Sequence, residues 1–146
     1  AWVRLLERAT WSGRDGHTAL VHNGAIYLMG GTQDPRSNFN DVWRSVNGRD
    51  WVLVCRHAAW RGRWQHAALS YQGHIYIVGG WTEGHGCLGD TWRSVDGIRW
   101  QKMCDDAPWG GRMFHSVIAA NGAMYLLGGS NGREKLNDVW VSTDGR

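Results

Sequence analysis

Short apolar segments alternate with turn-forming residue pairs along the whole chain. Alternation of apolar and polar side chains is typical of strands with one buried face, and Asn-Gly readily adopts the positive φ angles of tight hairpin turns. The pattern therefore predicts antiparallel hairpins with two-residue turns and an all-β fold class. Two such turn pairs occur early in the chain: Asn23-Gly24 between HTALVH and AIYLMG, and Asn47-Gly48 between DVWRSV and WVLV.

The same pattern recurs along the chain with a period of 49 residues, as His17, His66 and His115 show. Trp140 comes one residue early relative to this period, because the last unit is one residue shorter. A fixed period indicates a repeat architecture, in which each unit buries an apolar face against its neighbours. We therefore expect a single domain over residues 1–146, with four short strands in each repeat. The repeat units are residues 2–50, 51–99 and 100–146.

The residues within each unit resemble a known family. Residues 63–80 (RWQHAALSYQGHIYIVGG) show the order Arg-x-x-His and then Gly-x-Ile-Tyr-x-x-Gly-Gly, and residues 89–100 (GDTWRSVDGIRW) follow with Asp-x-Trp. This order resembles the Kelch repeat and covers the whole chain. The resemblance implies a Kelch-type β-propeller, in which four-stranded blades pack face to face around a central channel. Each chain would supply three blades.

The two ends of the chain are in phase with the repeat. Residues 2–6 (WVRLL) match a fourth strand with no earlier strands before it, whereas residues 115–144 supply three strands and no fourth. Known propellers have about four to eight blades, and three blades alone would expose apolar faces and an unpaired strand edge. We therefore predict a homodimer that forms a six-bladed ring, each chain lending residues 2–6 to the last blade of the other. The alternative is a piece of a longer propeller whose remaining blades complete the ring.

Candidate binding residues lie in the long loops, which we expect on one rim of the ring, opposite the short turns. Trp64 and Trp81 have no tryptophan at the equivalent positions of the other units, and Phe114 and Phe39 lie in the same loops. Exposed aromatic side chains stack on sugar rings or anchor peptides, although these could equally cover local apolar surface. The candidate ligand-binding residues are Trp64, Trp81, Phe114, Phe39, His85, Arg14, Arg63 and Arg112.

The three candidate arginines recur in phase with the repeat, at Arg14, Arg63 and Arg112. Recurrence favours a bracing role through buried hydrogen bonds, whereas guanidinium groups near the channel mouth would favour an acidic ligand. The in-phase histidines are interpreted as structural, because a metal site would need ligands that converge from separate blades. The cluster of His85 and Cys87 has no known metal-ligand spacing. We therefore predict no metal and no cofactor.

Composition and charge narrow the function further. The chain has 11 tryptophans, 21 glycines and a net charge of +3, with no run of basic residues, so we do not expect nucleic acid as a partner. No apolar run approaches the length of a membrane span, so we expect no membrane partner. Three cysteines argue against a disulfide framework and favour a reducing compartment such as the cytoplasm.

No arrangement of residues typical of catalysis stands out, and we predict that the protein is not an enzyme. The first functional hypothesis is a self-assembling scaffold, natural or engineered, or a protein-interaction module that dimerises into a six-bladed propeller. The alternative is a carbohydrate- or peptide-binding propeller that uses aromatic and arginine side chains on the long-loop rim. Function must be decided on the site and not on the fold.

Overall fold

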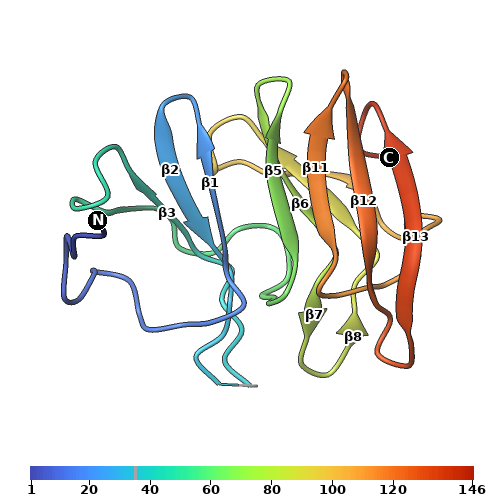
Figure 1. Cartoon of the computed structure of the whole chain (residues 1–146). Helices are drawn as coiled ribbons and strands as arrows, with labels where there is room; N and C mark the ends of the chain where they lie inside the picture. The colour runs from blue at the N-terminus through green and yellow to red at the C-terminus, as the bar shows by residue number, and fades with distance from the viewer. Residues whose placement is uncertain (35) are drawn as a thin grey trace.

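The computed structural model describes residues 1–34 and 36–146 and contains a row of three twisted antiparallel sheets (Figure 1). The first sheet, which we call the first blade, has its strands in sequence order, from an inner strand to an outer one. Each strand pairs antiparallel with the next. Its strands are β1 (Thr18–His22), β2 (Ala25–Met29), β3 (Val42–Ser45) and β4 (Val52–Cys55).

The second and third blades repeat this arrangement, and the third has three strands. The all-β prediction is confirmed for the described residues, as is the order of four strands in the first two blades. The second blade contains β5 (Ala67–Tyr71), β6 (His74–Val78), β9 (Thr91–Ser94) and β10 (Gln101–Cys104), and a hairpin of β7 (Trp81–Thr82) and β8 (Gly86–Cys87) extends from it. The third blade contains β11 (Ser116–Ala120), β12 (Ala123–Ser130) and β13 (Lys135–Ser142).

The turn between the first two strands of each blade is the predicted two-residue hairpin. Asn23 has φ 48° and Gly24 has φ 72°, and β1 pairs with β2 up to His22 opposite Ala25. Two successive positive φ angles are what this class of turn requires. Asparagine and glycine tolerate that region of φ better than other residues do.

The prediction of a two-residue turn at Asn47-Gly48 is wrong. Residues 46–51 separate β3 from β4, and Gly48 has a positive φ whereas Asn47 does not. The side chain of Asn47 instead accepts hydrogen bonds from the backbone amides of Arg49 and Asp50, both at 2.9 Å. Asparagine therefore acts here by capping backbone amides, which produces a longer loop.

The core consists of apolar side chains trapped between neighbouring blades. Tyr27, Met29 and Val42 of the first blade pack against Trp60, which precedes the second blade, and against Ile75 within it. Burying each large apolar side chain stabilises the fold by roughly 1.5–3 kcal/mol. A second cluster joins the second blade to the third. The inner strand β5 contacts both β1 and β11, so the three inner strands follow one another (Figure 1).

Residues 1–17 lead into the first blade without forming a strand. Trp2 and Val3 are fully or largely exposed, and the N-terminus lies beside the first blade, at the end of the row opposite β13 (Figure 1). In the described part of the chain there is no helix long and apolar enough to cross a membrane.

Candidate interaction surfaces

An ion pair with a buried arginine side chain braces each blade. The guanidinium of Arg63 donates hydrogen bonds to both carboxylate oxygens of Asp90, at 2.6 and 2.8 Å, and to the carbonyl oxygen of Gly79 at 2.9 Å. Burial alone would raise the pKa of Asp90, but the hydrogen bonds and charge of Arg63 outweigh it and hold the pKa below 3.8. The same pairing joins Arg14 to Asp41 and Arg112 to Asp138.

These contacts decide between the two interpretations of the arginines. The side chains of Arg14, Arg63 and Arg112 are almost wholly buried. The terminal nitrogens of each guanidinium donate to the paired aspartate and to the carbonyl oxygen of a glycine of the same blade. Each paired carboxylate also accepts a hydrogen bond from the tryptophan two residues later, as Asp90 does from the indole of Trp92 at 2.7 Å. The geometry favours bracing over ligand binding at these three arginines.

The candidate aromatics separate into two groups. Phe39 is half-buried and covers the guanidinium of Arg14, 4.0 Å from its ring centroid, so it shields a brace. Trp64 and Trp81 form an edge-to-face pair at 5.8 Å, and their backbones exchange hydrogen bonds at 3.0 and 2.9 Å. Phe114 has 54% of its surface exposed. His85 is exposed in the turn between β7 and β8.

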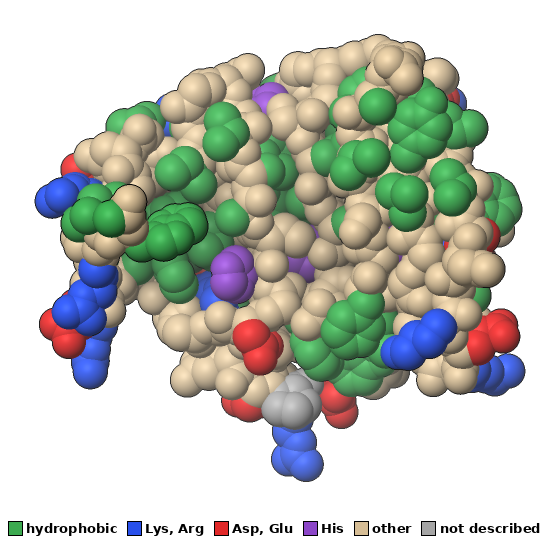
Figure 2. All heavy atoms as spheres, viewed as in Figure 1, with side chains coloured by type: hydrophobic (Ala, Val, Ile, Leu, Met, Phe, Trp, Pro, Cys, Tyr) green, Lys and Arg blue, Asp and Glu red, His purple; other side chains and the backbone are tan. Residues whose placement is uncertain are grey.

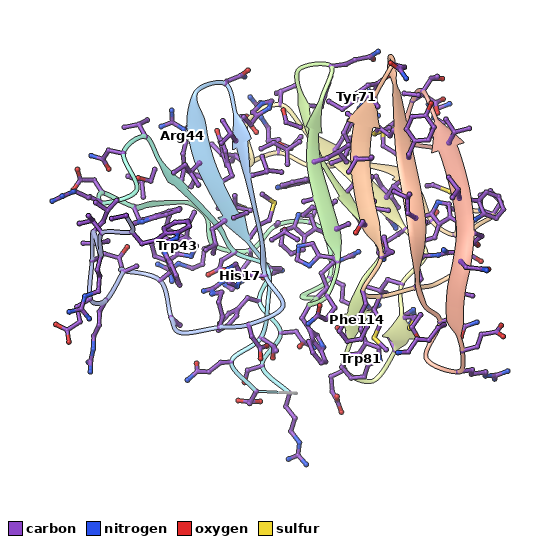
Figure 3. The ribbon with its side chains drawn as sticks, viewed as in Figure 1. His17, Trp43, Arg44, Tyr71, Trp81 and Phe114 are labelled. Carbon is purple, nitrogen blue, oxygen red and sulfur yellow. The ribbon has the colours of Figure 1, made fainter. Side chains whose placement is uncertain are left out.

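Trp64, Trp81 and Phe114, which we call the rim patch, come together across the junction of the second and third blades. The amide of Phe114 donates to the carbonyl oxygen of Gln65 at 3.1 Å, so its backbone lies beside the residue that follows Trp64. Figure 3 shows Trp81 and Phe114 together at the lower edge of the molecule. Figure 2 shows large hydrophobic side chains gathered over this edge, where Figure 1 places β7 and β8.

The two internal blade junctions are built from the same contacts. The amide of Gly31 donates to the carbonyl oxygen of Arg63 at 2.8 Å, and Gly80 donates to Arg112 at 2.8 Å. A Cβ atom on Gly30 would lie 2.6 Å from Cε1 of His66, so glycine is needed for the imidazole to approach. At the second junction, Gly79 and His115 have the same relationship, at 2.8 Å.

Burial lowers the basicity of the histidines at these junctions. Burial, with the charge of Arg63 and the neighbouring histidines, holds the pKa of His66 well below 6.5. Burial lowers the pKa of His115 to about 4, against the opposing effect of its hydrogen bond to the carbonyl of Val78. His17 is the exposed member of this set, at the lower end of β1 in Figure 3.

The outermost faces of the row lack the contacts that the internal junctions have. Val42 and Thr91, at equivalent positions of the first two blades, are 0% and 4% exposed, whereas Val139 of the third blade is 64% exposed. A Cβ atom on Gly128 would meet only the backbone of Leu136 within the described part of the chain, and no histidine. We call the surface of Ile118, Tyr125 and Val139 the third-blade face, and that of His17, Ala19 and Ile26 the first-blade face.

The tryptophans outside the strands show the same break in the repeat. Trp11 meets Trp51 edge to face at 6.0 Å, and Trp60 meets Trp100 in the same way at 5.8 Å. Trp109 has no such tryptophan partner among the described residues. A largely apolar cavity opens beside it, between the second and third blades. The described residues contain no group of histidine, cysteine, aspartate or glutamate that could hold a metal ion.

The sequence favoured a bracing role for the arginines and offered the three aromatic residues of the rim patch as binding candidates, which stay a prediction, but it gave no indication of the cavity. The sequence signal that bears on the cavity is the spacing of Trp2, Trp51 and Trp100, which lie 49 residues apart. A family model described as the KLHDC2/KLHL20/DRC7 Kelch-repeats domain matches residues 2–143. No curated protein matches the chain.

Proposed function

The chain belongs to the Kelch-repeat family of protein-interaction domains, and from this premise we propose that two copies close into a six-bladed propeller, which then acts as an interaction scaffold. The third-blade face of each copy would pack on the first-blade face of the other. Such a head-to-tail contact closes after two copies when the rotation between them is two-fold. Each protomer then uses both of its open faces.

The observation that carries the proposal is the exposure of Val139. Its counterparts Val42 and Thr91 are buried by the blade that follows them, but Val139 meets none. A second copy could cover Val139 as the second blade covers Val42. The residues of its first-blade face occupy the same repeat positions as the residues by which the second and third blades contact the blade before them. Covering Val139 and its apolar neighbours would stabilise the ring by roughly 1.5–3 kcal/mol for each large side chain.

The free edge of β13 supports an exchange of strands. β3 and β9 each pair with an outer strand, β4 and β10 respectively, whereas among the described residues β13 pairs only with β12. An unpaired edge strand readily accepts another strand. Residues 2–6 correspond in phase to β4 and β10, and they form no strand within their own chain. In the proposed ring they add to β13 of the other copy.

A pair of matched variants tests the ring. Val139→Asp would put a charge into the contact between copies, and we expect the protein to elute from size-exclusion chromatography as a folded single chain. Val52 is also exposed, but it lies on the outer strand β4 of the first blade, at a position where the second blade has Gln101. Val52→Asp should therefore elute like the unmodified protein. Equal elution of both variants and the unmodified chain would count against the ring.

A second candidate function is peptide or carbohydrate binding at the rim patch. The supporting observation is that Phe114 is 54% exposed beside the Trp64–Trp81 pair, and exposed aromatic clusters mark binding sites. Peptide and glycan arrays probed with the chain and with Trp81→Ala test it. Loss of a bound signal with an unchanged elution volume would support the patch. A signal that survives Trp81→Ala and Phe114→Ala would rule it out.

A further inference from the structure

We propose that the cavity beside Trp109 is a seat for an indole side chain and that Trp2 of a second copy occupies it. This seat rests on the proposed two-copy ring and adds the anchor that fastens the exchanged strand. Trp2 of each copy would lie inside the junction between the second and third blades of the other copy. This position is separate from the contact between the third-blade face and the first-blade face. The junction of the second and third blades would then be incomplete within one chain.

The first internal junction shows how such a seat is filled. Trp100 packs on the cluster between the first two blades and meets Trp60 edge to face, with an interplanar angle of 88°. Its indole nitrogen donates a hydrogen bond to the carbonyl oxygen of Gly97 at 3.0 Å. Trp51 repeats both contacts, with Trp11 and with Gly48 at 3.1 Å. The chain thus forms the same arrangement twice: an edge-to-face tryptophan pair with an indole hydrogen bond to a glycine carbonyl. We call this arrangement the tryptophan lock.

The cavity lies where a third lock would be. It is lined by Trp109, Tyr76 and Gly145, the equivalents of Trp60, Tyr27 and Gly97 at the first junction. Its remaining walls include Met124, Leu126 and Trp140.

Polarity and shape both suit an indole. The carbonyl oxygen of Gly145 accepts one hydrogen bond, from the hydroxyl of Thr91 at 2.6 Å, and a carbonyl oxygen has a second lone pair for an indole N–H. The aromatic wall of Trp109 offers the edge-to-face contact that tryptophan pairs prefer. A phenyl or aliphatic side chain would satisfy the apolar walls but leave the carbonyl without its second donor.

Trp2 is the occupant that the repeat phase selects. It lies 49 residues before Trp51, and its side chain is fully exposed in its own chain. Its segment sits beside the first blade, at the opposite end of the row from β13 (Figure 1). In a two-fold ring the first blade of one copy follows the third blade of the other, which brings Trp2 to the cavity of the second copy.

The dimer dissociation constant of variants, measured by sedimentation of dilution series, tests the seat. Trp2→Ala should raise the constant by at least about a hundredfold, because a buried tryptophan anchor is lost at two symmetric sites. Val3→Ala is the matched control, since its counterpart Val52 is exposed, and it should change the constant by less than about threefold. An unchanged constant for Trp2→Ala would overturn the seat while leaving the ring intact.

Titration with free indole gives an independent readout. The Trp2→Ala chain should bind one indole per chain, and adding Leu126→Trp to fill the cavity should abolish that binding. The unmodified dimer should bind none, because its seats are full. Absence of indole binding to the Trp2→Ala chain would overturn the seat. A single-chain mass for the unmodified protein would refute the ring itself.

Discussion

Trp60 and Trp100 meet edge to face at 5.8 Å between the first two blades, although they come from different connecting segments. Trp60 lies in the loop that enters the second blade, and Trp100 lies just before its outer strand. The pair therefore joins the loop that enters the second blade to the loop before its outer strand, at the surface where that blade meets the first.

Replacing the buried partner of that pair should destabilise the chain strongly. Trp60 is fully buried, and Trp60→Ala should lower the free energy of unfolding by about 3–5 kcal/mol through lost burial and the cavity left behind. Chemical denaturation measures this change. Trp81→Ala at the rim patch is the control and should cost much less. Equal losses would show that Trp60 is not part of the core.

Close approach of an imidazole makes Gly79 irreplaceable. A Cβ there would lie 2.8 Å from Cε1 of His115 and 2.9 Å from the carbonyl oxygen of Arg112. Gly79→Ala should cost about 3 kcal/mol or more, combining positive φ with steric overlap. Gly73 has a similarly positive φ, but nothing lies within 4 Å of its added Cβ. Gly73→Ala should therefore cost only about 1–2 kcal/mol, and the same denaturation experiment compares the two.

The arginine braces should not tolerate lysine. Lysine cannot donate two parallel hydrogen bonds to Asp90 and a third to the carbonyl of Gly79, so Arg63→Lys should cost about 2–4 kcal/mol. Arg99 is exposed and lies 3.9 Å from Asp96, which makes Arg99→Lys a suitable control with a change below about 0.5 kcal/mol. Thermal melting of both variants measures the difference. A small effect at Arg63 would contradict the bracing role.

Stability should fall between pH 6.5 and pH 4. His115 has its pKa lowered from 6.5 to about 4 by burial, so the unfolded chain binds more protons than the folded chain in this window. Stability is therefore full above 6.5 and decreases as the pH falls, by about 3 kcal/mol in all for this residue. Urea denaturation at pH 7.5 and 4.5 tests it. His115→Gln should flatten the dependence, although His66 will leave a remainder.

Much of the fold could be predicted because the repeat places equivalent residues in phase. The predicted hairpin turn at Asn23-Gly24 needs two positive φ angles, and both residues have them. Asn47-Gly48 contains the same residues, but its asparagine caps backbone amides instead. A dipeptide alone does not determine which of these two roles an asparagine side chain takes. That depends on the surrounding loop.

The candidate site was only partly predictable, for a related reason. Recurrence indicated that Arg63 braces its blade, but its partner Asp90 could be identified only once β6 and β9 lay side by side. The cavity beside Trp109 is a space between two blades, and no local pattern marks such a space. It appears when Trp109 is compared with Trp60 in three dimensions.

The mass of the unmodified chain in solution tests the central claim most directly. Light scattering coupled to chromatography at about ten micromolar protein should give twice the 16.4 kDa of one chain, because micromolar or tighter association is expected of an interface with several buried aromatic anchors. A mass of 16.4 kDa at that concentration, with a cooperative melting transition, would contradict the two-copy ring.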